Sequence, residues 1–295
     1  MKKLVLALSA AAAFAAPALA ADMAAKAPLR PAPVAYAPSW TGCYVGGGGG
    51  YGMWNQENVG YLEPFAVRPI ALAPATAVAE AELIRVAAPK GTLATRARIT
   101  DTVTSGGRGW FGTVQGGCDY QFGLGPYQLV IGAFGDYDFA DIHGRHAFAG
   151  LPLVADEKLS SQWAVGGRIG WVALPNLMVF FSGGYTEARF DRQNYTNLFG
   201  PPFGIDQGAF TDERTYKGWF LGAGDEYALN FLPGLFWKTE YRVSEFSRVQ
   251  SNVLFRTATG LPTTFSEDSK KWVQTVRSEL VYRFNWSGVG GPTRY

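Results

Sequence analysis

Eight segments of alternating polarity, separated by gaps of two different lengths, most constrain the fold of this 295-residue chain. We expect strands at 40–54, 107–122, 128–139, 159–173, 177–190, 215–229, 235–246 and 271–285. Every second gap is short and carries Pro or Gly, as tight turns require: 123–127, 174–176 and 230–234. The other gaps are long: 55–106, 140–158, 191–214 and 247–270. Short turns at one end and long loops at the other are typical of an antiparallel barrel in a membrane.

The pattern therefore predicts an all-β fold, an eight-stranded antiparallel transmembrane β-barrel over 40–285, with short periplasmic turns and long outer loops. A ten-stranded barrel is the alternative, because a second hairpin could lie within 55–106. We favour eight strands, with residues 96–104 extending the second strand above the membrane.

Aromatic residues gather at both ends of these strands and predict two girdles, one at each membrane interface. Those toward the long loops are Tyr51, Trp54, Trp110, Tyr137, Trp163, Tyr185, Trp219 and Trp272. Those toward the short turns are Trp40, Tyr120, Trp171, Tyr227, Trp237, Tyr282 and Phe284. A soluble aromatic-rich barrel is the alternative, but its core needs no two separate belts. Charged residues are 17% of the chain, below the roughly 25% of soluble domains, which also suits a lipid-facing wall.

The N-terminal segment MKKLVLALSAAAAFAAPALA has the basic start, apolar run and A-x-A site of a secretory signal peptide over 1–20. We expect cleavage between Ala20 and Ala21, an Ala/Pro-rich periplasmic lead-in over 21–39, and a C-terminal tail over 286–295. No later stretch is long and apolar enough for a helical membrane span. The mature chain carries equal numbers of basic and acidic residues, so a nucleic-acid partner is not expected. The predicted location is the outer membrane of a bacterium.

The segment WTGCYVGGGGGYG predicts a strand whose inward face is nearly free of side chains. Its lumen face would be Gly42, Tyr44, Gly46, Gly48 and Gly50, which makes room for long charged side chains in a narrow barrel. Low-complexity drift in a tolerant strand is the plainer alternative. The glycines also match G-x-G-x-x-G, but no strand and helix flank them as a dinucleotide site requires.

The other strands are expected to fill the lumen with a charge network of Arg168, Glu226, Lys238, Glu240, Arg242, Arg277 and Glu279. Buried charges must be paired, so we expect Glu240, Glu279 or Glu226 to neutralise Arg242 and Arg277. The same alternation places Asp119, Asp136, Asp138 and Arg283 on the polar faces of their strands.

The only two cysteines, Cys43 and Cys118, are predicted to form a disulfide, because the signal peptide directs them to an oxidising compartment. Both cysteines face outward on strands that should pair antiparallel. In such a pair the residue numbers of opposite residues have a constant sum, which is 161 if Cys43 lies opposite Cys118. That register puts Tyr51 opposite Trp110 and Thr41 opposite Tyr120. Two separate small residues on a lipid-facing wall are the alternative.

The only histidines, His143 and His146, lie in the expected second outer loop. Their H-x-x-H spacing could hold zinc or haem iron, but no cysteine or acidic cluster of metal-site spacing accompanies them. They could also serve a lipase or acyl-transfer enzyme, but no serine motif such as G-x-S-x-G is present. We therefore expect a solvated loop, no catalytic residue, no metal and no cofactor.

With these features the chain resembles the small outer-membrane β-barrel proteins of alphaproteobacteria, the porin-like surface antigens. The matching segments are WTGCYVGGGGGYG after a Pro/Ala-rich lead-in, GWFLGAGDEYAL at 218–229, LFWKTEYRV at 235–243 and VRSELVYRF at 276–284. The resemblance implies an OmpA-like eight-stranded barrel, inserted by the barrel-assembly machinery, with a structural or surface role and no known catalysis. Two features depart from the pattern: the long Ala/Val/Pro-rich loop 55–106, and the continuation of the chain beyond Phe284.

We expect a structural outer-membrane protein that contacts outer-membrane lipids and exposes its loops at the surface. Two alternatives are a porin-like passive pore for small solutes and a surface receptor or adhesin that binds a ligand such as haem through its outer loops. The filled lumen of an eight-stranded barrel argues against the pore.

Overall fold

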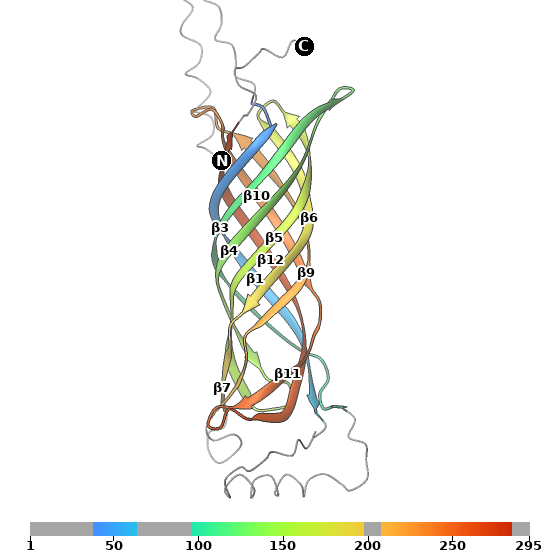
Figure 1. The fold of residues 1–295 in the computed structure, drawn as a ribbon, viewed down its shortest axis with the longest axis vertical. Coiled ribbons are helices and arrows are strands. Elements are labelled where there is room, and N and C mark those ends of the chain that lie inside the picture. The colour runs from blue at the N-terminus through green and yellow to red at the C-terminus, as the bar shows by residue number, and fades with distance from the viewer. Residues whose placement is uncertain (1–37, 64–95, 198–207, 285–295) are drawn as a thin grey trace, which may run out of the picture. The chain divides into compact units, whose positions relative to one another are not determined.

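The structure is a computed structural model that describes residues 38–63, 96–197 and 208–284 (Figure 1). No helix in this part of the chain is long and apolar enough to cross a membrane. The strands are β1 (Gly42–Leu62), β2 (Ala97–Arg98), β3 (Val103–Leu124), β4 (Tyr127–Ala147), β5 (Leu153–Leu174), β6 (Leu177–Phe190), β7 (Gln193–Asn197), β8 (Ala209–Thr211), β9 (Arg214–Ala228), β10 (Leu235–Phe246), β11 (Val249–Arg256) and β12 (Pro262–Phe284).

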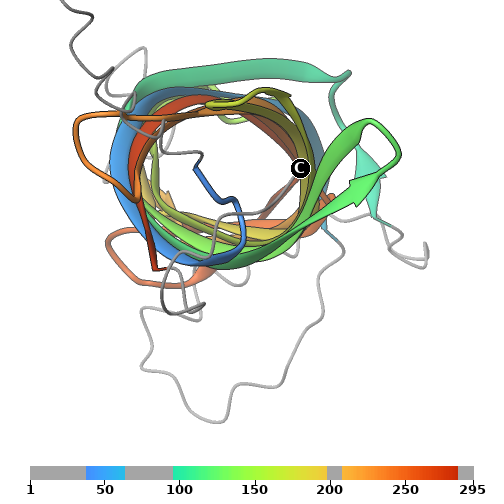
Figure 2. The ribbon, with the colours of Figure 1, turned by 90° about the horizontal axis from the view of Figure 1, so that it is seen from above.

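Eight of these strands close into an antiparallel barrel, as the alternation predicts: β1, β3, β4, β5, β6, β9, β10 and β12. The ring is closed because β12 pairs with both β10 and β1, and Figure 2 shows it along the barrel. The ten-stranded alternative is wrong, since β1 pairs directly with β3 and leaves no place for two more strands between them. The signal peptide, its cleavage site at Ala20 and Ala21, the lead-in up to residue 37 and the tail from 285 lie outside the described residues.

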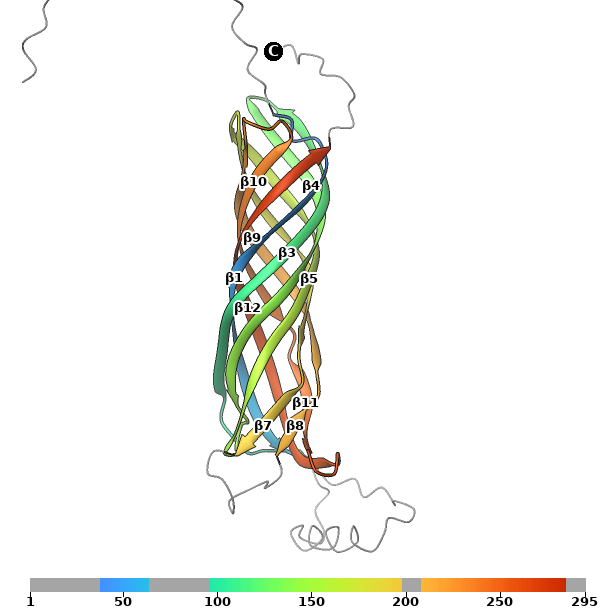
Figure 3. The same cartoon turned by 90° about the vertical axis from the view of Figure 1, so that its left-hand side faces the viewer.

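The barrel is longer at its outer end than the sequence predicts, and much of the expected loop sequence is strand. β1 extends to Leu62, β4 to Ala147, and β12 begins at Pro262 rather than at 271. Where β6, β9 and β10 end, the short strands β7, β8 and β11 continue the ring by pairing from β5 across to β12 (Figure 3). We call this part, which lies beyond the outer aromatic girdle and at the lower end of the barrel in Figures 1 and 3, the outer extension.

Two local features explain why the alternation of polar and apolar residues does not predict the outer extension. A β-bulge at Ser160 on β5 switches the inward positions from even to odd numbers, so Glu157 points inward and Lys158 outward. Residues 96–104 do not simply lengthen the second strand either. Only Val103 and Thr104 belong to β3, whereas β2 pairs with the end of β1, where Arg96 binds Glu63 at 2.8 Å.

The glycine run of β1 is sterically required on its inward side. A Cβ atom at Gly48 would lie 2.7 Å from the Glu279 Cα, and one at Gly50 would lie 2.5 Å from the Phe111 Cζ. On the outward side, the nearest atom to a Cβ at Gly47 is 3.5 Å away. Gly48 and Gly50 on the lumen face of β1 therefore cannot carry a side chain without a backbone shift, whereas Gly47 on the outer face has room for one.

The Cys43–Cys118 disulfide is present, and the register that predicts it is confirmed. Tyr51 lies opposite Trp110 in the outer girdle, with ring centroids 5.0 Å apart in an edge-to-face contact. Thr41 lies just before β1, so it is not in the paired strand, but its hydroxyl accepts a hydrogen bond from the Gln121 N–H at 3.0 Å. The disulfide thus fixes the periplasmic ends of two neighbouring strands.

Candidate functional site: the filled interior of the barrel

The interior of the barrel is organised in layers, with three polar networks separated by apolar side chains. The periplasmic network consists of Asp119, Arg168, Glu226 and Arg283. The central network consists of Gln115, Asp136, Asp138, Lys238, Glu240, Arg242, Arg277 and Glu279. The outer network consists of Gln56, His146, Glu157, Gln193, Glu267 and Lys271. All of these residues are buried.

The periplasmic network is a closed ring of alternating charges. Arg168 donates to Glu226 at 2.9 Å and to both carboxylate oxygens of Asp119. Arg283 completes the ring, with 2.6 Å from its Nη1 to Asp119 and 3.0 Å from its Nε to Glu226. Two arginines and two carboxylates balance one another, as burial of charge demands.

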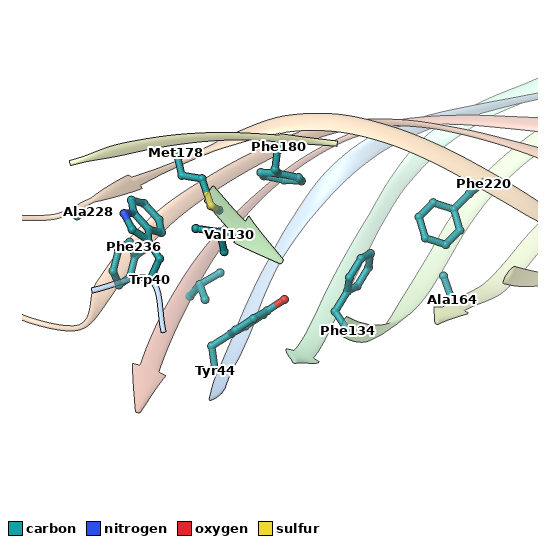
Figure 4. Close-up of a cluster of buried hydrophobic side chains, with 11 residues drawn as sticks. Trp40, Tyr44, Val130, Phe134, Ala164, Met178, Phe180, Phe220, Ala228 and Phe236 are labelled. Atoms are coloured by element: carbon teal, nitrogen blue, oxygen red, sulfur yellow. The ribbon is translucent and has the colours of Figure 1, made fainter. Parts of the chain in front are cut away.

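Aromatic side chains close the barrel beneath and above this ring. Figure 4 shows Trp40 beside Phe236 at one end of the cluster, and their ring centroids are 4.8 Å apart. Phe134 and Phe220 lie at the other end, with centroids 6.0 Å apart, facing the central network. The Arg242 guanidinium lies 4.3 Å from the Phe220 ring centroid, so the layers are in direct contact.

The central network spans the lumen from wall to wall. Arg242 on β10 binds Asp136 on β4 at 2.9 Å, and Arg277 on β12 binds Asp138 on β4 at 3.0 Å. Lys238 binds Glu240 at 2.9 Å and Glu279 at 3.1 Å. The network therefore joins β10 and β12 to β4 across the interior, and not only to their hydrogen-bonded neighbours.

The partners of the two predicted arginines differ in part from those expected. Glu240 does contact Arg242, at 3.2 Å, and Glu279 lies 3.9 Å from Arg277. The shorter contacts are to Asp136 and Asp138, however, and Glu226 binds Arg168 and Arg283 instead. Strand alternation identifies the inward residues, but it gives no register across the lumen. In a narrow barrel an arginine can reach the opposite wall.

A second apolar layer separates the central network from the outer network. It contains Trp54, Phe111, Ile142, Leu159, Phe190, Tyr216, Phe246 and Val273. The Arg277 guanidinium lies 5.4 Å from the Phe111 ring on one side of it, and the Lys271 Nζ lies 4.1 Å from the Phe190 ring on the other. A third cluster, including Phe148, Tyr195 and Leu254, packs in the outer extension beyond the outer network.

His146 belongs to this interior, so its assignment to a solvated loop is wrong. It lies on β4 with 3% of its surface exposed, and its Nε2 is 3.1 Å from a Glu267 carboxylate oxygen. Its Nδ1 is 2.8 Å from the Gln56 amide nitrogen, which also donates to Glu157 at 2.7 Å. Burial opposes protonation of the imidazole, but the Glu267 and Glu157 carboxylates together outweigh it and raise the pKa of His146.

His143 is exposed on the outer face of β4, where two aspartates hold it. Its Nδ1 lies 2.7 Å from Asp156 and its Nε2 lies 3.0 Å from Asp141. Both ring nitrogens are thus bound to carboxylates in this structure. Among the described residues, no group of three or more His, Cys, Asp or Glu side chains is placed to hold a metal ion.

Comparisons with known proteins agree with a barrel of the outer membrane. No family model matches the chain. The chain is 30% identical over 290 residues to the 31 kDa outer-membrane immunogenic proteins of Brucella melitensis biotype 1 and Brucella suis biovar 1. These alignments cover 96% of this chain and 100% of each relative.

Solved structures similar to this one include the outer membrane protease OmpT of Escherichia coli and Ail, the attachment invasion locus protein of Yersinia pestis. OmpT matches with a TM-score of 0.37 and 10% identity, over 82% of this chain and 97% of OmpT. Ail matches with a TM-score of 0.27 and 10% identity, over 81% of this chain and 99% of Ail.

Proposed function

This chain belongs to the family of the 31 kDa outer-membrane immunogenic proteins, and from that premise we propose that it is a non-conducting structural barrel that carries an outer extension above the membrane. The observation that carries this proposal is the central network, in which Arg242 and Arg277 cross the lumen to Asp136 and Asp138. The alternative of a passive pore requires a continuous aqueous path through these contacts.

Opening such a path is energetically unfavourable. Removing one partner of a buried ion pair typically costs about 3–5 kcal/mol, because the other charge is left uncompensated. A solute would have to pass three charged networks and also the apolar layer that includes Trp54, Phe190 and Phe246. Eight-stranded barrels have an interior just wide enough for side chains to fill, which agrees with this arrangement.

The receptor alternative has no support from the two histidines that suggested it. His146 is enclosed in the outer network, and His143 binds Asp141 and Asp156 with its two nitrogens. Exposure of loops at the cell surface, carried by the outer extension, is instead the role that we propose. Insertion by the barrel-assembly machinery and contact with outer-membrane lipids stay predictions at this point.

Planar-bilayer recording of the mature full chain tests the proposal. We expect no stable conductance steps at protein amounts for which a heat-dependent shift in gel mobility demonstrates folded protein. A Trp54→Ala, Phe190→Ala double variant, which removes two side chains of the apolar layer, is the comparison. It shows how much irregular current a barrel with a loosened interior produces. Stable channels of defined size in the parent protein would contradict the proposal.

A further inference from the structure

Basic side chains gather on one side of the outer extension, directly above the outer aromatic girdle. On β3, Arg108 precedes the outward and exposed Trp110 by two residues, which is about 7 Å along the strand. Arg108 lies opposite His143 on β4, which lies opposite Lys158 on β5. Arg145 is the next outward residue on β4, so its Cα is a diagonal neighbour of Arg108, about 7–8 Å away. We call these four residues the basic collar.

The acidic residues nearby are already bound to other members of the collar. Asp141 binds Lys158 at 2.7 Å and His143 at 3.0 Å. Asp156 lies opposite Arg145 in the register, but its carboxylate binds the His143 Nδ1 at 2.7 Å. That hydrogen bond to Asp156 also raises the pKa of His143, which favours its charged form.

Arg108 and Arg145 consequently have no ion-pair partner among the described residues, although both are exposed. Two outward cations on the other side of the barrel, Arg189 on β6 and Lys217 on β9, are paired. Arg189 binds Glu213 at 2.5 Å, and Lys217 lies 3.8 Å from Glu187. Two exposed arginines without an ion pair thus lie as diagonal neighbours on the face of the barrel formed by β3, β4 and β5.

We propose that Arg108 and Arg145 form a binding site for the phosphate groups of an outer-leaflet lipid. An aromatic girdle marks the level of the lipid headgroups, and the two guanidinium groups lie one step above Trp110, where a headgroup phosphate is located. A guanidinium group binds phosphate with two parallel hydrogen bonds, and two guanidinium groups on diagonal positions can share one phosphate. The acyl chains of the same lipid would cover the exposed Trp110 and Phe139 below.

Native mass spectrometry of the mature full chain, released from zwitterionic detergent with added bisphosphorylated lipid A, tests this site. We expect a bound lipid on the parent protein and much weaker binding of enzymatically dephosphorylated lipid A. The Arg108→Gln, Arg145→Gln double variant should bind about thirtyfold more weakly. This factor combines the usual contributions of two basic residues to binding an anionic membrane surface. The charge-preserving Arg108→Lys, Arg145→Lys variant should recover most of the binding.

A matched double variant, Arg189→Gln with Lys217→Gln, removes the same number of charges from paired cations on the other side of the barrel. We expect it to bind like the parent. An equal loss in this control would overturn the proposal in favour of general charge attraction, as would unchanged binding in the Arg108→Gln, Arg145→Gln variant. Full competition by inorganic phosphate alone would also overturn it, because the site would then recognise the free anion and not the lipid. A heat-modifiable band confirms folding of each variant before it is measured.

Discussion

The membrane-spanning part of the barrel and the outer extension share the same strands but differ in what their outer faces meet. Between the two girdles most outward side chains are apolar, such as Val114, Ile131 and Leu280, each about half exposed. Above the outer girdle the outward side chains are charged, such as Lys158, Arg189 and Glu213. The inward face is polar in networks and apolar in layers throughout. Only the outer face therefore distinguishes a strand in lipid from a strand in water.

The largest effect should come from breaking the central network within the membrane-spanning part. Replacing Arg277 with Met removes the cation that lies 3.0 Å from Asp138, while Asp136 loses a contact of 3.4 Å but keeps Arg242 at 2.9 Å. We expect the free energy of unfolding to fall by about 3–5 kcal/mol. Urea-induced unfolding in lipid vesicles, followed by tryptophan fluorescence, measures it.

Lys270→Met is the matched control for this variant, because it removes a cation from a partly exposed pair with Glu245 on the neighbouring strand. Its effect should stay below about 1 kcal/mol, as for other surface ion pairs. A parent-like stability of Arg277→Met would show that the arginine is hydrated in the lumen, and the filled-interior description would then fail.

The difference between the two regions also explains what the sequence predicts and what it does not. Apolar and polar residues alternate wherever one face meets lipid, so the number of strands, the faces and the Cys43–Cys118 register are predictable. In the outer extension both faces of the strands carry polar residues, and the bulge at Ser160 shifts which residues of β5 point inward. The sequences of these strands therefore resemble those of loops.

The pairing across the lumen is not predictable from alternation for a different reason. Sequence order and register give the hydrogen-bonded neighbour of each strand. They do not show which residue lies on the opposite wall of the lumen. The contact between Arg242 on β10 and Asp136 on β4 is of this kind. Asp119, Asp136, Asp138 and Arg283 are nevertheless on the inward faces that alternation identifies, and that is the signal by which they could be added to the network.

A buried cation in the outer extension should have a more local effect. Lys271 binds Glu157 at 2.5 Å and is fully buried, so Lys271→Met should destabilise the outer network by about 3 kcal/mol. The short strands β7, β8 and β11 are separated from β6, β9 and β10 by breaks in the strands, which permits local opening. Hydrogen exchange should rise in β7, β8 and β11 and stay unchanged in β6, β9 and β10. An equal rise in both sets would mean that the two regions unfold as one unit.

A smaller effect is expected from adding one methyl group to the glycine strand in the membrane-spanning part. Gly48→Ala places a Cβ 2.7 Å from the Glu279 Cα and should cost about 2 kcal/mol, since the backbone of β12 must move. Gly47→Ala, one residue away on the lipid-facing side, meets its nearest atom at 3.5 Å and should be close to neutral. Unfolding midpoints in urea compare the two variants directly. Equal costs at both positions would imply a general requirement for flexible backbone and not for space in the lumen.

The smallest effect concerns the pH dependence of the outer extension, which the membrane-spanning part should not share. The groups that face His146 are Glu267, whose carboxylate is 3.1 Å away, Glu157 and Lys271. The pKa of His146 is raised in the folded protein, so its stabilising contribution is complete below the unfolded value of about 6.5. It is lost as the pH rises through the folded pKa. Hydrogen exchange in β11 and in the outer part of β12 should therefore quicken in the parent as the pH rises above about 6.5, after correction for intrinsic exchange, and His146→Gln should remove this change. His143→Gln, at an exposed and solvent-screened site, should leave most of it in place. If the acceleration persists in His146→Gln, another titrating group controls the outer network.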